Sequence, residues 1–153
     1  MKESDLKSLS KDLNYGLVKQ KNIFIIENFN KNFNCKLNEL KYKFARMDYI
    51  DEEKKIYVEL KSRRCSSYMF DTTLIPKDKI DYAKKRIIEG YKCYLLFVFE
   101  NYEHYYIEID DDKFKRYECK KFKRGFRIDT NDKEKDYYYI PISDLIDITP
   151  CFF

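Results

Sequence analysis

The sequence is poor in the residues that usually separate domains. Its 153 residues include only three glycines and three prolines, and it contains no repeat and no low-complexity linker. A chain of this length can bury one hydrophobic core but not two independent ones. We therefore expect residues 1–153 to form a single domain with one functional site.

Histidine and paired cysteines, the usual ligands of structural zinc, are also scarce. The chain has one histidine, and its five cysteines include no C-x-x-C pair, so a zinc site is not expected. Unpaired cysteines are typical of reduced thiols in an intracellular protein. The first residues lack the apolar core of a signal peptide, and no apolar run approaches about 18 residues. We expect a soluble protein of the cytoplasm or nucleus, with no membrane partner and no small-molecule cofactor.

A strong excess of one charge is missing as well. The 31 basic and 27 acidic side chains leave a formal net charge of +4, which permits a polyanionic partner without demanding one. What the chain does have is apolar bulk. Hydrophobic residues make up 44% and aromatic residues 18% of the sequence, which is enough for a globular core and excludes a wholly disordered chain.

The apolar spacing predicts an α/β (α+β) fold with a central mixed β-sheet flanked by helices. Leucines and isoleucines at helical spacing predict a helix from Ser4 to about Asn32, in one piece or in two with a break at Gly16. Alternating residues over 42–61 predict a hairpin or meander, and residues 62–75 have no period and are interpreted as a hydroxyl-rich loop.

A second helix and further strands are expected in the second half. Pro76 is suited to a first helical position, and Gly90 is a typical stop signal. The nearly all-apolar segment 94–99 is typical of a central strand buried on both faces. Shorter strands are expected at 104–109 and 137–142. A strand, helix and strand between residues 56 and 99 favour a crossover that joins parallel neighbours.

A charged pair stands within the otherwise apolar strand of the predicted hairpin. Glu59 and Lys61 share one face of that strand because side chains alternate between faces. If the hairpin pairs Ile50 with Tyr57, Asp48 lies opposite Glu59, whereas a slip of one residue would move Asp48 to the other face. The register is not readable from the sequence. The simpler interpretation is a half-exposed hairpin whose charges are only solvated.

These residue types in this arrangement favour metal-assisted hydrolysis of a phosphodiester. The Asp48 and Glu59 carboxylates and the Leu60 carbonyl would offer hard oxygen ligands to Mg²⁺, for which Mn²⁺ can substitute. The ion would lower the pKa of a bound water and neutralise charge in the transition state. Lys61 would orient or deprotonate that water, or stabilise the developing oxyanion.

Basic side chains around this strand are candidates for contact with nucleic acid. Arg63 and Arg64 would hold neighbouring phosphates through their guanidinium forks, or would simply be a solvated strand end. Lys77 and Lys79 fall in the first turn of the predicted helix, where positive charge opposes the helix macrodipole, and this indicates an anionic ligand. The tyrosines at 137–139 could stack bases or pack within a strand.

Asp48, ten intervening residues and Glu59-Leu60-Lys61 on an apolar strand resemble the motif of the PD-(D/E)XK superfamily of restriction-endonuclease-like nucleases. The predicted order of helix, hairpin, helix and buried strand over residues 15–100 looks like the core of that superfamily. The resemblance implies that Asp48, Glu59 and the Leu60 carbonyl bind the divalent metal and that Lys61 is the catalytic lysine. Met47 stands where the motif has proline.

A narrower resemblance involves short segments outside this motif. Residues 15–17, Thr72-Thr73 with Lys79, and the segment 127–129 with residues 138–142 look similar to small stand-alone nucleases of large DNA viruses, which implies a virus-encoded protein. The resulting expectation is a Mg²⁺-dependent endonuclease acting on DNA. A core this small has little surface with which to recognise a DNA base sequence. We therefore expect a homodimer, or recognition of a structural feature of the DNA, to provide substrate selectivity. The alternative is a non-catalytic nucleic-acid-binding module that retains the nuclease fold.

Overall fold

The computed structural model describes residues 3–122 and 135–151, and it describes side chains from residue 16 onward. The segment 127–129, which contributes to the narrower resemblance, lies outside the described residues. The chain divides into two compact units, one reaching to Lys36 and one starting at Leu37. Each unit is described by itself.

The first unit is a single helix, α1 (Glu3–Phe33). It runs through Gly16 without interruption, so the prediction of one continuous helix is confirmed and the alternative with a break at Gly16 is not. A glycine costs about 1 kcal/mol relative to alanine inside a helix, which a helix of 31 residues tolerates. Asn34 then adopts a left-handed φ of 49°, and the Cys35 amide donates to the Asn30 carbonyl at 3.1 Å. This is a common way for a helix to end.

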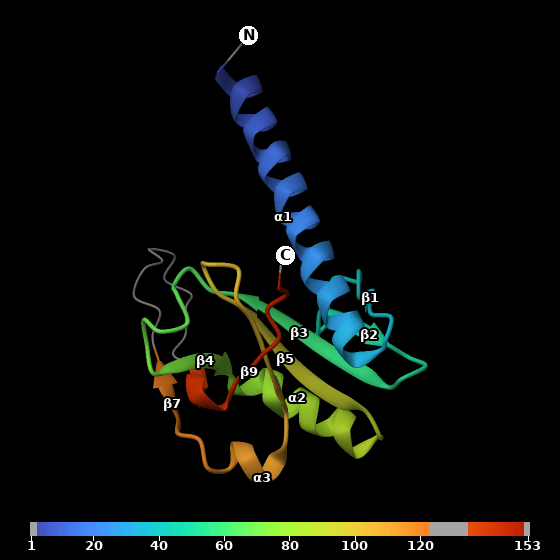
Figure 1. Ribbon diagram of the computed structural model, residues 1–153, viewed down its shortest axis with the longest axis vertical. Helices are drawn as coiled ribbons and strands as arrows, with labels where there is room; N and C mark the ends of the chain where they lie inside the picture. The colour runs from blue at the N-terminus through green and yellow to red at the C-terminus, as the bar shows by residue number, and fades with distance from the viewer. Residues whose placement is uncertain (1–2, 123–134, 152–153) are drawn as a thin grey trace. The chain divides into compact units, whose positions relative to one another are not determined.

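The second unit contains a mixed six-stranded sheet (Figure 1). Its strand order is β1-β2-β3-β5-β6-β9. Among the described pairings of this sheet, β3 and β5 are parallel and the others are antiparallel. The expected mixed sheet and its parallel neighbours are therefore confirmed. The strand bounds are β1 (Asn38–Glu39), β2 (Tyr49–Asp51), β3 (Ile56–Ser62), β5 (Lys92–Val98), β6 (His104–Glu108) and β9 (Ile146–Asp147).

A smaller antiparallel sheet has the order β4-β8-β7. The strand β4 includes residues 72–75, which the sequence predicted as loop, and this prediction was wrong. The segment is extended because it pairs along its length with the distant β8. Pro76 ends β4 and precedes the helix, instead of occupying its first position. The strands of this sheet are β4 (Thr72–Pro76), β7 (Cys119–Phe122) and β8 (Lys135–Pro141). The helical elements of the second unit are α2 (Lys77–Ile88), α3 (Asp111–Phe114) and the 3₁₀ turn η1 (Ile142–Asp144).

The predicted hairpin is confirmed only in its second part. The strands β2 and β3 pair with Ile50 opposite Tyr57, and Lys55 in the connecting turn has a left-handed φ of 57°. The alternation seen from residue 42 does not produce a strand there. Instead, the Ala45 amide donates to the Tyr42 carbonyl at 3.1 Å and closes a turn.

The core lies where α2 contacts β5 and the smaller sheet. Every residue of β5 after Lys92 is buried, which confirms the predicted central strand. The helix α2 contributes Ile80 and Ala83, both fully buried. The spacing of three residues places both side chains on one side of the helix. This packing brings the first turn of α2 toward the face of β3 that carries its charged residues.

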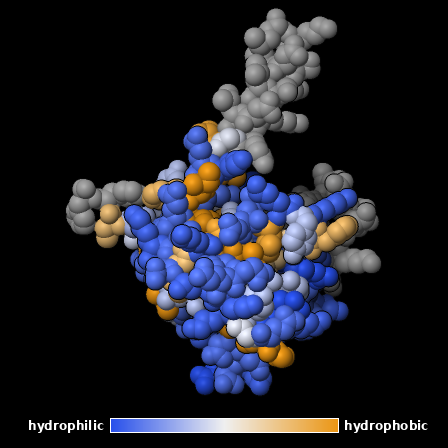
Figure 2. Space-filling model, turned by 90° about the vertical axis from the view of Figure 1, so that its right-hand side faces the viewer, coloured by the Kyte–Doolittle hydropathy of each residue, from blue (hydrophilic) through white to orange (hydrophobic). Residues whose placement is uncertain are grey.

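One face of the molecule is mostly polar. Figure 2 shows a face on which hydrophilic side chains predominate, as expected for a chain with 38% charged residues. Within the described part of the chain, no helix combines the length and the apolar character needed to cross a membrane.

Replacing Ile80 by alanine should destabilise the fold strongly. Ile80 is fully buried, and removing such a side chain leaves a cavity that costs about 2–5 kcal/mol. Ile88→Ala on the same helix is the matched control because Ile88 is 86% exposed, and it should change stability by less than about 0.5 kcal/mol. Urea denaturation followed by circular dichroism measures both values. Equal effects of the two substitutions would contradict the assignment of this helix face to the core.

Candidate active site

The backbone of Asp48 lies between two neighbouring segments. The Asp48 amide donates to the Val58 carbonyl at 3.2 Å, and the Leu40 amide donates to the Asp48 carbonyl at 2.9 Å. The pairing of Ile50 with Tyr57 reaches Tyr49 opposite Val58, and Asp48, which directly precedes β2, is held beside β3 by its amide hydrogen bond to Val58. This is the register on which the expected site depends.

The side chain of Asp48 turns back onto β3. Its Oδ2 accepts a hydrogen bond from the Leu60 amide at 2.8 Å. In a strand, the N–H and C=O of one residue point toward the same neighbour. The Leu60 carbonyl therefore points to the side of Asp48 rather than toward β5. Two of the three predicted oxygen ligands, the Asp48 carboxylate and the Leu60 carbonyl, thus lie on the same edge of β3.

Glu59 is a buried carboxylate with two lysines on one of its oxygens. Only 3% of its side chain is exposed, and its Oε1 lies 3.3 Å from the Lys61 Nζ and 3.4 Å from the Lys79 Nζ. Its Oε2 is buried and has no hydrogen-bond partner among the described residues. Burial raises the pKa of Glu59, the charge of Asp48 raises it further, and the two lysines act in the opposite direction.

Lys79 reaches this site from the first turn of α2. Its ammonium group also donates to the Arg46 carbonyl. The sequence predicted Lys79 as a contact to nucleic acid and missed its pairing with Glu59. The signal was present in its location, since a cation at a helix N-terminus indicates an anionic partner. That partner is a carboxylate of the same chain.

The other predicted contacts to nucleic acid are distributed differently. Arg63 Nε donates to Thr73 Oγ1 at 3.0 Å, and an Arg63 terminal nitrogen donates to the Leu74 carbonyl. Arg63 thereby connects the end of β3 to β4. Arg64 is exposed, and the Lys77 Nζ pairs with Asp81 at 2.9 Å. Contact of Arg63, Arg64 or Lys77 with phosphates stays a prediction.

The donor set fits a hard divalent cation such as Mg²⁺. Two carboxylates and a backbone carbonyl are the oxygen ligands that such an ion prefers, and the buried Oε2 of Glu59 has an unused acceptor. Among the residues that the structure describes, no cluster of three or more His, Cys, Asp and Glu side chains could hold a metal. Water or substrate oxygens would therefore have to complete the coordination, which is common for Mg²⁺.

The arrangement combines negative and positive groups at a partly open position. The Lys61 and Lys79 side chains are 28% and 24% exposed, so their ammonium groups are within reach of a ligand, and the more buried Glu59 carboxylate lies directly beside them. Such a site can bind a cation through its carboxylates and an anion through its lysines. Phosphate esters with a divalent ion are ligands of this type.

Comparison of the chain with models of known protein families gave no match, and comparison with curated proteins gave none either.

Replacing Glu59 by glutamine should stabilise the metal-free protein at neutral and alkaline pH. Folding raises the pKa of Glu59 above its ordinary value of 4.5, so the folded chain binds this proton more tightly than the unfolded chain. The favourable contribution is complete below the ordinary pKa and is lost as the pH rises through the folded pKa. Glutamine removes that loss. Thermal unfolding in EDTA should show a higher Tm for Glu59→Gln at about pH 8, and a difference that shrinks toward about pH 4.

Asp111→Asn is the control of opposite sign. Asp111 lies 3.1 Å from the ammonium groups of both Lys84 and Lys115, and these contacts lower its pKa. Its contribution is present above the ordinary pKa and is lost as the pH falls. Asp111→Asn should therefore lower the Tm at about pH 8. A Glu59→Gln protein that is also less stable at this pH would contradict the raised pKa of Glu59.

Proposed function

We infer that the protein is a Mg²⁺-dependent nuclease that hydrolyses phosphodiester bonds of DNA, acting as an endonuclease. One observation carries this proposal: the β2–β3 register brings Asp48 beside Leu60 and Glu59, with Lys61 on the buried Glu59 carboxylate. A buried carboxylate with a raised pKa and specific charged partners is a typical feature of a functional site. A merely solvated hairpin face would leave Glu59 exposed.

The proposal includes a restriction-endonuclease-like core. It is supported by the order of an antiparallel hairpin, the helix α2 and a parallel central strand β5. In this arrangement α2 brings Lys79 over the charged face of β3. The mixed sheet provides a rigid base for the site, because β3 is paired on both of its edges.

Asp48, Glu59 and the Leu60 carbonyl would hold the metal ion. When bound there, the ion would lower the pKa of a coordinated water and neutralise negative charge on the phosphodiester. Mn²⁺ would substitute for Mg²⁺ because it accepts the same oxygen ligands. The unbonded Oε2 of Glu59 supports this role, since an unsatisfied buried oxygen is costly unless a ligand completes it.

The residues of the chain would act on the substrate as follows. Lys61 Nζ would orient the attacking water or take its proton, or would donate to the developing charge on a phosphate oxygen. The water oxygen forms a bond to phosphorus, one P–O ester bond breaks, and the leaving oxygen takes a proton. Lys79 Nζ, on the same Glu59 oxygen, would add positive charge beside the scissile phosphate. Preorganised cations of this kind stabilise the transition state selectively.

The substrate would be selected by shape or by a second copy of the chain. The second unit is small and offers limited surface for reading bases, so sequence recognition by one copy would be weak. A homodimer would double that surface and would place two sites on the two strands of a duplex. Arg64 and Lys77 would contact the backbone outside the site, where charge adds affinity without sequence preference.

Substitution of the three central side chains should abolish cleavage of circular plasmid DNA. Asp48→Asn, Glu59→Gln and Lys61→Met each remove a group that acts on the transition state, and each should lower the rate at least ~100-fold. Lys85→Met is the matched control, because Lys85 is an exposed lysine of α2. It should cleave like the wild type. Gel electrophoresis of plasmid with Mg²⁺, with Mn²⁺ or with EDTA measures the rates.

The same reactions distinguish the nuclease from the alternative binding module. If the wild-type protein shifts the mobility of the DNA in Mg²⁺ or Mn²⁺ but neither nicks nor breaks it, the protein is a non-catalytic nucleic-acid-binding module. This result would overturn the proposed nuclease activity. The Asp48→Asn protein should still bind DNA, because removing an anion beside phosphates relieves repulsion. Wild-type cleavage that persists in EDTA would refute the role of the metal.

Binding of Mn²⁺ can be measured without any substrate. Asp48→Asn should weaken Mn²⁺ binding in isothermal titration calorimetry, because it removes a charged ligand. Lys79→Met should strengthen it by ~5-fold, since the Lys79 ammonium lies 3.4 Å from the Glu59 Oε1 and repels a second cation at that oxygen. Lys85→Met again serves as the control, and equal affinities of all four proteins would argue against this metal site.

A further inference from the structure

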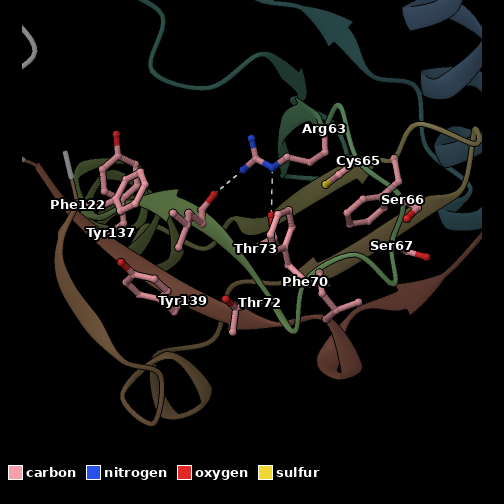
Figure 3. A pocket seen from close by; sticks show the side chains of 13 residues that line it. Arg63, Cys65, Ser66, Ser67, Phe70, Thr72, Thr73, Phe122, Tyr137 and Tyr139 are labelled. Carbon is pink, nitrogen blue, oxygen red and sulfur yellow. Dashed lines mark hydrogen bonds between the residues drawn. The ribbon is translucent and has the colours of Figure 1, made fainter. Parts of the chain in front are cut away.

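A second concave site lies beside the smaller sheet (Figure 3). It is a pocket of about 410 Å³, within the usual range of pockets for small organic ligands. Aromatic rings of Tyr137, Tyr139 and Phe122 lie on one side of it and Phe70 and Ser66 on the other, with Thr72 between them. None of these residues belongs to the candidate active site. The pocket therefore needs an explanation of its own.

The smaller sheet has two faces with different surroundings. Tyr138 and Ile140 of β8 point into the hydrophobic core. Because side chains alternate along a strand, Tyr137 and Tyr139 point the opposite way, and both line the pocket. The neighbour of Tyr139 across the ladder is Leu74, which also lines the pocket. Tyr138 thus packs in the core cluster, whereas Tyr139 and the more buried Tyr137 border the pocket on the other face of the strand.

Positive charge accompanies these rings. Arg63 lines the pocket and is fixed by its hydrogen bond to Thr73 and by its stacking over Phe97, at 5.4 Å from the ring centre. The Lys120 ammonium lies 4.7 Å from the centre of the Tyr139 ring. A pocket with aromatic walls, hydroxyl groups and adjacent cations matches a ligand that has a flat ring, polar edges and a negative charge. A nucleotide has all three.

The pocket continues from the same strand that carries the candidate active site. Glu59, Lys61 and Arg63 alternate along one face, and the Arg63 amide extends the ladder by donating to the Val98 carbonyl at 2.8 Å. At about 3.3 Å per residue, Arg63 follows Lys61 by about 7 Å. A nucleic acid lying on Lys61 would therefore have a neighbouring nucleotide within reach of the pocket.

We propose that this pocket binds one unpaired nucleotide of the DNA strand that occupies the candidate active site. The inference rests on the proposed nuclease function and narrows its substrate class to DNA with an unpaired or single-stranded position. The ring of the base lies against Tyr139 and Phe122, and its polar edge meets the hydroxyls of Thr72 and Ser66. The phosphate lies toward Arg63. A fully paired duplex cannot supply such a base without breaking a pair.

The loop that borders the pocket is consistent with this substrate. Tyr68, Met69 and Phe70 are all exposed, at 83%, 58% and 64%, and they follow the exposed Arg64. Exposed aromatic groups beside cations are typical of surfaces that bind single strands, because bases stack on the rings while the backbone meets positive charge. A purely apolar ligand would make no hydrogen bond to the hydroxyls of Ser66 and Thr72 that line the pocket.

The test compares the affinity of three DNA probes in EDTA, so that no cleavage occurs. The probes are a fully paired duplex, the same duplex with a one-nucleotide bulge, and a single strand, each with a fluorescent label for anisotropy. The wild type should bind the bulged and single-stranded probes more tightly than the paired duplex. Tyr139→Ala should weaken binding of the bulged probe by about 5- to 150-fold, the range for loss of one stacked base, and should leave paired-duplex binding unchanged.

Further variants separate stacking from a folding defect. Tyr139→Phe keeps the ring and should retain most of the affinity, and Phe70→Ala tests the pocket at a position that is 64% exposed. Tyr106→Ala removes a half-buried tyrosine of β6 outside the pocket and should bind every probe like the wild type. Thermal unfolding confirms that each variant is folded. Loss of bulge binding in Tyr139→Ala and Phe70→Ala, with the controls unchanged, supports the proposal.

Three results would overturn it. The first is that the wild type shows no preference for the bulged or single-stranded probe. The second is that the Tyr139→Ala and Phe70→Ala variants are both folded and still bind the bulged probe as tightly as the wild type. The third is a free nucleoside monophosphate that binds as tightly as the bulged duplex, which would mark a site for free nucleotides. Failure of the proposed nuclease function is recognised separately, because it appears as uncut plasmid in the presence of Mg²⁺ or Mn²⁺.

Discussion

The pairing of Ile50 with Tyr57 holds together the charged groups of the candidate active site. This register carries Asp48 to the edge of β3, where its carboxylate accepts the Leu60 amide. A shift by one residue would reverse the face of every side chain in β2 and separate Asp48 from Glu59. Lys61 meets Glu59 from the same face of β3, and Lys79 meets it from the first turn of α2.

Local patterns in the sequence were sufficient for some elements of the fold. The helix α2 is flanked by a start signal at Pro76 and a stop signal at Gly90, and β5 is nearly all apolar, so both could be predicted. The strand β4 could not, since it is extended by pairing with β8, which lies far away in the sequence. The sequence also left open whether Gly16 breaks the first helix, because a cost of about 1 kcal/mol at one residue can be outweighed by the rest of a long helix.

The candidate active site, like the fold, could be predicted only in part from the sequence. Alternation along one strand placed Glu59 and Lys61 on a common face, and the motif supplied Asp48, but only the structure provides the register that joins them. The pairing of Lys79 with Glu59 depends on how α2 lies over the sheet, which no local pattern encodes. Likewise, three consecutive tyrosines do not reveal which of them point away from the core.

The contact between Lys79 and Glu59 also links two structural elements. Lys79 belongs to the first turn of α2, and Pro76 immediately before that helix ends β4. A cation that replaced Lys79 on Glu59 would release one tether between this turn and β3. By thermodynamic reciprocity, anything that rigidified β4 with Lys79 in place would then make the cation harder to bind. Cation binding at Glu59 and the rigidity of the smaller sheet would thus be coupled through the ammonium group of Lys79.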